Sequence, residues 1–172
     1  MASVDEQRRT ALTLLARRDF SRGELRQRLT RKAAADAKST SRRNGSQGNE
    51  PLGAPGEGSH AENIDQLLDD LESNGHLSDA RFVESFVRGR LRRGQGPLRI
   101  RHDLAARGVD AELIDQHLTF TTEYWIARVH AIRARRFTEA LPAEATDRAR
   151  QARFLAQRGF PSDVIFAAFK PV

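Results

Sequence analysis

A repeat within the chain constrains its fold more than any other feature of the sequence. Residues 61–68 read AENIDQLL and residues 111–118 read AELIDQHL, so six of eight positions are identical at an offset of 111 − 61 = 50. A second match pairs residues 104–109 (LAARGV) with residues 155–160 (LAQRGF), at an offset of 155 − 104 = 51. A period of about 50 residues predicts a tandem array of helical units, each too small to bury its apolar side alone.

Residues 78–118 indicate how one unit is built. Their apolar residues follow helical spacing, and turn-forming residues divide them into three short helices. Gly94 and Gly108 are expected to end the first two helices, because glycine enters the left-handed conformation at low cost. Pro97 suits the first position of the second helix, where no hydrogen bond from its missing N–H is needed. Asp110 is expected to cap the third helix.

The same alternation along the whole chain predicts an all-α protein of about nine helices. Runs of β-branched residues and alternating apolar patterns are nearly absent, so no sheet is expected. We divide the chain into three three-helix modules, arranged as an elongated array. Their predicted ranges are 1–75, 76–120 and 121–172.

The first module contains a stretch that does not follow the helical pattern. Residues 31–60 are rich in Ala, Ser, Gly, Asn and Pro, and Leu52 is their only large aliphatic residue. Such a segment buries too little apolar surface to offset its ordering entropy, so we expect most of it to be a disordered loop. A helix is expected to extend at most into residues 32–37. Ser59 and Glu62 have capping-box spacing, which predicts that the next helix begins after Ser59.

Positive charge gathers in the central module. The chain has 29 Lys and Arg against 23 Asp and Glu, a formal net charge of +6. Residues 88–107 hold seven arginines and a single acidic residue, Asp103. At about 100° per residue, Arg81, Arg88 and Arg92 lie within roughly 40° of one another, opposite the apolar side of their helix. Clustered arginines favour an anionic partner, such as a nucleic acid or an acidic protein groove.

The sequence contains no recognisable catalytic motif. It has no cysteine, its five histidines lack metal-binding spacing, and no phosphate-binding loop or nucleophile motif is present. We therefore expect no enzyme activity, no metal and no cofactor. His117 lies on an apolar stripe, where a packed, hydrogen-bonded histidine is the better interpretation. The only residues that would support an enzyme are the acidic residues of 65–72. We interpret these acidic residues as a solvated helix face.

The chain also lacks the signals of membrane insertion and export. No run approaches the roughly 20 apolar residues of a membrane span. The N-terminal residues lack the uninterrupted apolar core of a signal peptide. The sequence therefore predicts a cytoplasmic protein without a membrane partner.

Three segments resemble the RecX family of regulatory proteins. They are LLARRDFSRGELRQRL (14–29), LSDARFVESFVRGRLRRGQGPLRIRHDLAARGVD (77–110) and RARQARFLAQRGFPSDVI (148–165). The strongest part is 79–110, where the arginines, phenylalanines and turn glycines keep the family's order and spacing. The resemblance implies tandem three-helix repeats in a curved, extended protein. The long loop of the first module is not typical of the family.

The resemblance also implies a partner and an activity. Members bind the filament of the RecA recombinase on single-stranded DNA and modulate, in the inhibitory direction, its recombinase, ATPase and co-protease activities. We expect a monomer that contacts RecA and, through electrostatic and sequence-independent contacts, single-stranded DNA. The alternative is a free-standing basic DNA-binding protein or transcriptional regulator. The arginines expected at the filament or DNA are Arg88, Arg92, Arg93, Arg99 and Arg81 of the central module and Arg17, Arg18 and Arg26 of the first.

Overall fold

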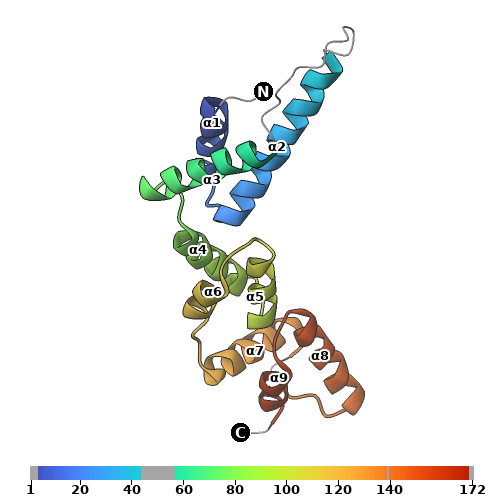
Figure 1. Ribbon diagram of the computed structural model, residues 1–172. Helices are drawn as coiled ribbons and strands as arrows, with labels where there is room; N and C mark the ends of the chain where they lie inside the picture. Colours follow the sequence, from blue (N-terminus) through green and yellow to red (C-terminus); the bar gives the residue numbers. More distant parts are fainter. Residues whose placement is uncertain (1–3, 44–56, 139, 171–172) are drawn as a thin grey trace. The chain divides into compact units, whose positions relative to one another are not determined.

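The protein is all-α in a computed structural model that describes residues 4–43, 57–138 and 140–170. Within these ranges it has nine helices and no strand, which confirms the predicted fold class (Figure 1). The helices are α1 (Val4–Leu15), α2 (Arg22–Arg43), α3 (Glu57–Ser73), α4 (Asp79–Arg92), α5 (Pro97–Ala105), α6 (Ala111–His117), α7 (Thr122–Arg136), α8 (Ala145–Gln157) and α9 (Ser162–Ala168).

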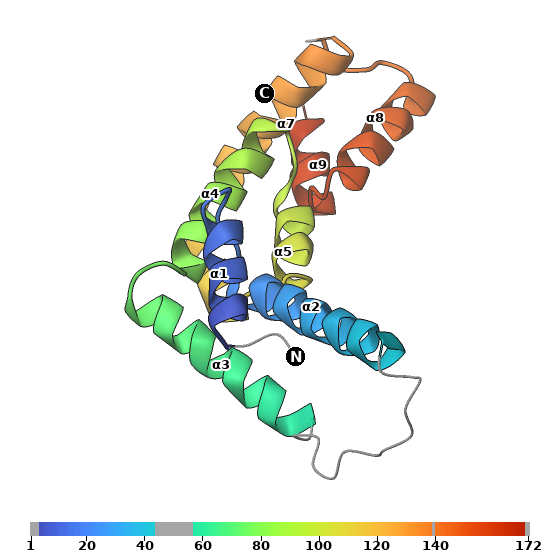
Figure 2. The same cartoon turned by 90° about the horizontal axis from the view of Figure 1, so that it is seen from above.

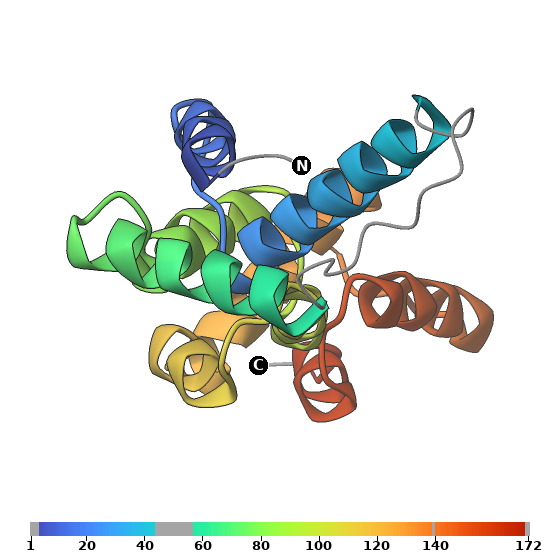
Figure 3. The same ribbon diagram turned by 45° about the horizontal axis from the view of Figure 1, so that its top comes forward.

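The helices form two compact units, Met1–Phe82 and Val83–Val172, and the boundary falls inside α4. In the first unit α1, α2 and α3 pack on one another (Figures 1 and 3). Their predicted apolar stripes meet in one core, in which every side chain is at most 3% exposed. Its residues are Ala11, Phe20, Leu25, Leu29, Ile64, Leu67, Leu68, Leu71 and Leu77.

In the second unit α9 packs on both α7 and α8 (Figure 2), and α5 packs on α6 (Figure 1). Trp125 of α7 is buried and meets the ring of Phe160 edge to face, with 6.1 Å between the ring centroids. The same helices contribute buried aliphatic residues, including Ile100, Leu104, Ile114, Val129, Leu155, Val164 and Ile165. The finer division into three modules, with boundaries after residues 75 and 120, stays a prediction.

The predicted loop at residues 31–60 is wrong at both of its ends. Helix α2 continues to Arg43, and α3 begins at Glu57, two residues before the predicted start at Ser59. The part of the predicted loop that remains, residues 44–56, lies outside the described residues.

Local propensity explains why α2 is longer than expected. Residues 32–38 are mostly Ala and Lys, which are strong helix formers, and extending an existing helix needs no apolar burial. The Lys32 ammonium adds ion pairs with Asp36, one turn along α2, at 3.3 Å, and with Glu6 of α1 at 3.1 Å. An exposed helix is therefore stable here even though the segment has almost no core residues.

Gly94 ends α4 as predicted. Its φ is +71°, its N–H donates to the Leu91 carbonyl at 2.9 Å, and the next N–H, of Gln95, donates to the Arg90 carbonyl at 3.1 Å. These two bonds form a Schellman motif and satisfy carbonyls that the last helical turn leaves open. The same pair of bonds closes α3, α5 and α8 at Gly75, Gly108 and Gly159.

The predicted helix starts in the central segment are also confirmed. Pro97 is the first residue of α5, following Gly96 in an extended conformation. The Asp110 carboxylate accepts hydrogen bonds from the N–H groups of Glu112, at 2.9 Å, and Leu113, at 3.4 Å, and so caps α6. Caps and stop glycines in matching places give each of these short helices defined ends.

Candidate functional site

The arginines of α4 occupy the face that the sequence predicts. Arg88 and Arg92 are exposed, whereas Val83 and Val87 on the opposite face are buried. This separation follows from helical periodicity, because residues three, four and seven apart share a face. The structure thus presents a basic strip along one side of the helix.

The end of α4 carries the least constrained charges of this strip. Arg92 and Arg93 are exposed, and across the described ranges neither side chain has an ion pair or hydrogen bond. We call Arg92, Arg93 and Gly94 the α4 tip. A free guanidinium can donate two parallel hydrogen bonds to a phosphate or a carboxylate, which makes the α4 tip a suitable anion-binding surface.

Arg88 and Arg99 are bound only loosely. Arg88 pairs with Glu84 one turn back, and its side chain is 63% exposed. The Arg99 Nε lies 3.3 Å from Asp103 Oδ1, and its side chain is 53% exposed. The Arg88–Glu84 pair is exposed on both sides and contributes about 0–1 kcal/mol, so a partner's phosphate or carboxylate can replace it at little cost. Asp103 is only 13% exposed, but it also pairs with Arg90, so Arg99 shares its acidic partner with a second arginine.

Arg81 serves the fold. Its Nη2 donates to the Gly75 carbonyl at 2.7 Å and reaches the His76 carbonyl at 3.3 Å. These carbonyls belong to the turn that closes α3. The guanidinium therefore stabilises the α3–α4 turn, although the side chain is exposed.

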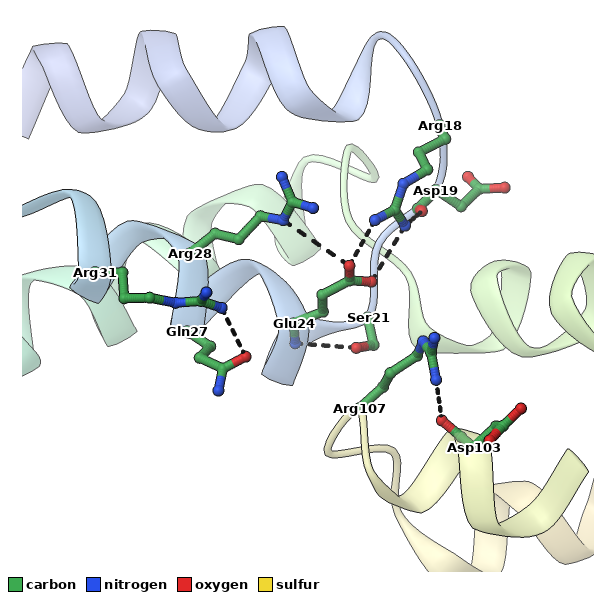
Figure 4. Close-up of polar contacts among 9 residues, drawn as sticks. All are labelled: Arg18, Asp19, Ser21, Glu24, Gln27, Arg28, Arg31, Asp103 and Arg107. Atoms are coloured by element: carbon green, nitrogen blue, oxygen red, sulfur yellow. Dashed lines mark hydrogen bonds and ion pairs between the residues drawn. The ribbon is translucent and has the colours of Figure 1, made fainter. Parts of the chain in front are cut away.

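In the first unit, Arg18 is held on several sides (Figure 4). Its Nη1 and Nη2 donate to the two Glu24 carboxylate oxygens at 3.1 and 2.5 Å, and its guanidinium carbon lies 3.7 Å from the centre of the Phe20 ring. Glu24 is fixed in turn, because its N–H donates to Ser21 Oγ at 3.0 Å, the bond by which Ser21 caps α2. Arg18 thus joins the α1–α2 turn to the start of α2.

Arg26 is bound within the fold, whereas Arg17 is not. Arg26 donates from Nε and Nη2 to the two oxygens of Asp65, both at 2.8 Å, which ties α2 to α3. Arg17 is exposed and has no ion pair or hydrogen bond with any described side chain. Of the four candidates in the first unit, which include Arg81, Arg17 is the one whose charge is fully available.

Two central arginines outside the candidate set point inward. Arg90 is mostly buried, with its guanidinium carbon 4.6 Å from the centre of the Phe86 ring and its Nη2 3.2 Å from Asp103 Oδ2. Burial lowers the pKa of the Arg90 guanidinium below its ordinary value, against the opposing effect of the Asp103 charge. Arg107 lies 5.0 Å from the same ring and donates to the Asp103 carbonyl (Figure 4). The contact between Arg90 and Phe86 could have been predicted from sequence, since Arg90 follows Phe86 by one helical turn.

The acidic residues of α3 are bonded to arginines. Asp69 and Glu72 lie 2.7 and 2.8 Å from the Arg22 guanidinium, and Asp65 holds Arg26. Burial acts to lower the pKa of Arg22, but hydrogen bonds and charge from Asp69 and Glu72 outweigh it, so this pKa is raised. These carboxylates lie on an exposed face of α3, as predicted, and form ion pairs with arginines of α2. Among the described residues no group of three or more potential ligands could hold a metal.

Aromatic and histidine side chains of the second unit belong to the fold. Trp125 is a core residue, and Tyr124 stacks on Phe120 at 4.5 Å and is only half-buried. His117 is half-buried, with Nδ1 2.9 Å from the Leu113 carbonyl, so it is hydrogen-bonded as predicted.

No described helix is long and apolar enough to cross a membrane.

Comparison with known proteins identifies two of the helical segments. Residues 78–118 match the family model for the RecX second three-helix domain. Residues 122–169 match the model for the RecX third three-helix domain. Together these matches span α4 to α9, which includes the α4 tip.

Curated relatives and solved structures agree with these matches. The chain is 40% identical over 158 residues to a regulatory protein RecX of Pseudomonas savastanoi pv. phaseolicola, covering 92% of this chain and 86% of that protein. It is 37% identical over 167 residues to one from Halorhodospira halophila, covering 97% and 88%. Its fold resembles the crystal structure of RecX from Lactobacillus salivarius, with a TM-score of 0.68 at 18% identity, covering 96% of this chain and 93% of that one. A second RecX crystal structure gives a TM-score of 0.63 at 20% identity, covering 96% and 72%.

Proposed function

Because the chain belongs to the RecX family of regulatory proteins, we propose that it binds the RecA filament on single-stranded DNA and inhibits its recombinase, ATPase and co-protease activities. It acts as a cytoplasmic monomer and makes electrostatic contacts with the DNA. Membership of a regulatory family also agrees with the expectation that the chain is not an enzyme.

One observation carries the choice of binding surface. The α4 tip presents two exposed guanidinium groups without a partner among the described side chains, within the segment matched by the second-domain family model. Arg88 adds a loosely paired charge one turn earlier on the same helix. We therefore place the main contact with the filament on Arg88, Arg92 and Arg93. Arg99 and Arg17 contribute beside it, and Arg81, Arg18 and Arg26 act through the fold.

The test is the ATPase rate of RecA on single-stranded DNA while the protein is titrated in. Wild type should lower the rate at substoichiometric amounts, as expected for an effect on filament growth. The combined Arg88→Ala and Arg92→Ala variant should need about tenfold more protein, the equivalent of roughly 1.4 kcal/mol. Its helical circular dichroism should be unchanged, because both side chains are exposed.

A matched control distinguishes the effect of losing this surface from the effect of lowering the total charge. Arg135 and Arg153 are exposed arginines of α7 and α8, and replacing both with Ala removes the same two charges. This control should inhibit RecA like wild type. If the Arg88→Ala, Arg92→Ala variant also inhibits like wild type, the α4 strip is not the binding site. If even wild type lowers the rate only when it saturates the DNA, the alternative of a general DNA-binding protein gains support.

Salt dependence then distinguishes phosphate from protein contacts. On single-stranded DNA, log K falls with log salt by about 0.7 for each phosphate contacted. If both arginines contact phosphates, the double variant should reduce this slope by about 1.4. An unchanged slope with weaker binding would assign both arginines to RecA itself.

A further inference from the structure

The α4 tip is held by arginines that come from the third-domain segment. The Arg158 Nη1, at the end of α8, donates to the carbonyls of Arg93 at 2.9 Å and Gly94 at 3.3 Å. The Arg128 Nη2 of α7 donates to the Leu91 carbonyl. All these residues belong to the second compact unit.

These contacts complete the end of the helix. The last turn of a helix leaves carbonyl groups without partners, and cations near this end also interact favourably with the helix dipole. Here the last carbonyls of α4 receive hydrogen bonds from both directions. The turn's own N–H groups bond to Arg90 and Leu91, and the two guanidinium groups of α7 and α8 bond to Leu91, Arg93 and Gly94.

Backbone hydrogen bonds also join the turn between α4 and α5 to the end of α8. The Gly96 N–H donates to the Arg158 carbonyl at 2.7 Å, and the Leu98 N–H donates to the Gly159 carbonyl at 3.0 Å. Gly94 itself is enclosed, since a Cβ atom on it would lie 3.2 Å from Arg158 Nη1 and from Ile132 Cδ1. The turn between α4 and α5 is therefore bonded to the end of α8 by both backbone and side chain.

We propose that Arg158, assisted by Arg128, is a positioning residue that fixes the α4 tip for binding to the filament. The inference rests on the proposed function, because it assigns Arg158 a role in presenting Arg92 and Arg93. Arg158 does not itself touch the partner. Its guanidinium is directed at the protein's own carbonyls and lies 4.6 Å from the centre of the Phe154 ring.

A double-mutant cycle tests whether Arg158 acts through the tip. The half-inhibitory concentration against the RecA ATPase is measured for wild type, Arg158→Ala, the tip variant (Arg92→Ala with Arg93→Ala) and their combination. Arg158→Ala should raise it about three- to tenfold in the wild-type background and less than about twofold in the tip variant, since coupled residues are not additive. Arg153→Ala, which removes an exposed charge from the same helix, should have no such effect.

Amide hydrogen exchange of the protein alone gives a readout that does not depend on RecA. Arg158→Ala should speed exchange at Gly94 and Gln95, the amides of the closing turn, whereas Arg153→Ala should not. Arg158→Lys should restore much of the protection and of the inhibition. A single nitrogen of Arg158 serves both carbonyls, so an ammonium group can replace it.

The outcomes separate the two proposals. If the tip variant inhibits RecA like wild type, the proposed site and the positioning role are both overturned. If the tip variant is defective and Arg158→Ala is not, only the positioning role is overturned. Equal losses from Arg158→Ala in both backgrounds would mean that Arg158 acts independently of the tip, which also overturns it. A higher half-inhibitory concentration and faster amide exchange in Arg158→Ala, with rescue of both by Arg158→Lys, would support the positioning role.

Discussion

Replacing Gly96 with alanine tests the tight backbone junction at the start of α5. A Cβ atom on Gly96 would lie 2.4, 2.5 and 2.6 Å from the Gly159 oxygen, the Gly159 carbonyl carbon and the Phe160 nitrogen. All three are backbone atoms and cannot rotate away. The φ and ψ of Gly96 are −88° and 171°, which suit alanine, so the whole cost comes from the contact.

The magnitude follows from the displacement that the contact demands. Ordinary contact distances begin at 3.4 Å, so the two segments must separate by about 3.4 − 2.4 = 1.0 Å. That movement weakens the hydrogen bonds from the Gly96 and Leu98 N–H groups, each worth about 0.5–1.5 kcal/mol net. Overpacking adds about 1–3 kcal/mol. We expect Gly96→Ala to lower the free energy of unfolding by about 2–6 kcal/mol.

Gly89→Ala is the matched control. Gly89 lies inside α4, and a Cβ atom there meets nothing within 4 Å. Alanine should therefore stabilise the helix by about 0.5–1 kcal/mol, the opposite sign to Gly96→Ala. Urea denaturation followed by the fluorescence of Trp125, the chain's single tryptophan, reports on the second unit. A wild-type midpoint for Gly96→Ala, or equal losses in both variants, would refute the reasoning.

Three further predictions concern caps, turns and pH. Asp110→Ala should lower the free energy of unfolding by about 1 kcal/mol in urea denaturation, because α6 loses its N-terminal cap. Gly75→Ala meets open space but must keep a φ of +71°, so circular dichroism should report a loss of about 1–2 kcal/mol. Burial raises the pKa of Asp79, against the hydrogen bond from the Arg22 N–H, so its contribution to stability falls as the pH rises through the aspartate range. Asp79→Asn should therefore stabilise the protein more at about pH 7 than at about pH 3, and an equal change at both would contradict this cause.

The helices could be predicted from sequence because their ends are encoded locally. Gly94, Pro97, Gly108 and Asp110 each act within a few residues of their position, and all four do what their residue type favours. The α2 extension was missed for an equally physical reason. The prediction for residues 31–60 weighed apolar burial alone, although helix propagation depends on propensity and on neighbouring charges.

The site could be predicted only in part, because the state of each arginine depends on distant partners. Arg26 meets Asp65 across 39 positions, and Arg158 meets the carbonyl of Arg93 across 65. Helical periodicity places Arg88 and Arg92 on an exposed face but carries no information about such contacts. Sequence therefore identifies a basic surface, and the structure separates the arginines that stabilise the fold from those that are available.

A recurring arrangement explains why so many arginines are used internally. In the first unit Phe20 lies beneath two guanidinium groups, those of Arg18 and Arg28, at 3.7 and 5.2 Å, and both pair with Glu24. In the second unit the Phe86 ring lies beneath the guanidinium groups of Arg90 and Arg107, and Arg90 pairs with Asp103. The two carboxylates are only 17% and 13% exposed, so each arrangement neutralises charge next to an aromatic ring.

This arrangement changes how the positive charge of residues 88–107 should be read. Arg90 and Arg107 lie over Phe86, and Arg101 pairs with Asp115 of α6, so three of the seven arginines contact an aromatic ring or an acidic side chain of another helix. Arg88 is held by one exposed pair, which contributes little, and Arg99 is itself exposed and shares Asp103 with Arg90. Charge density alone would rank all seven equally as binding residues. Removing those with an aromatic ring or an acidic side chain on another helix leaves Arg88, Arg92, Arg93 and Arg99, and of these Arg92 and Arg93 of the α4 tip have no ion pair or hydrogen bond within the described ranges.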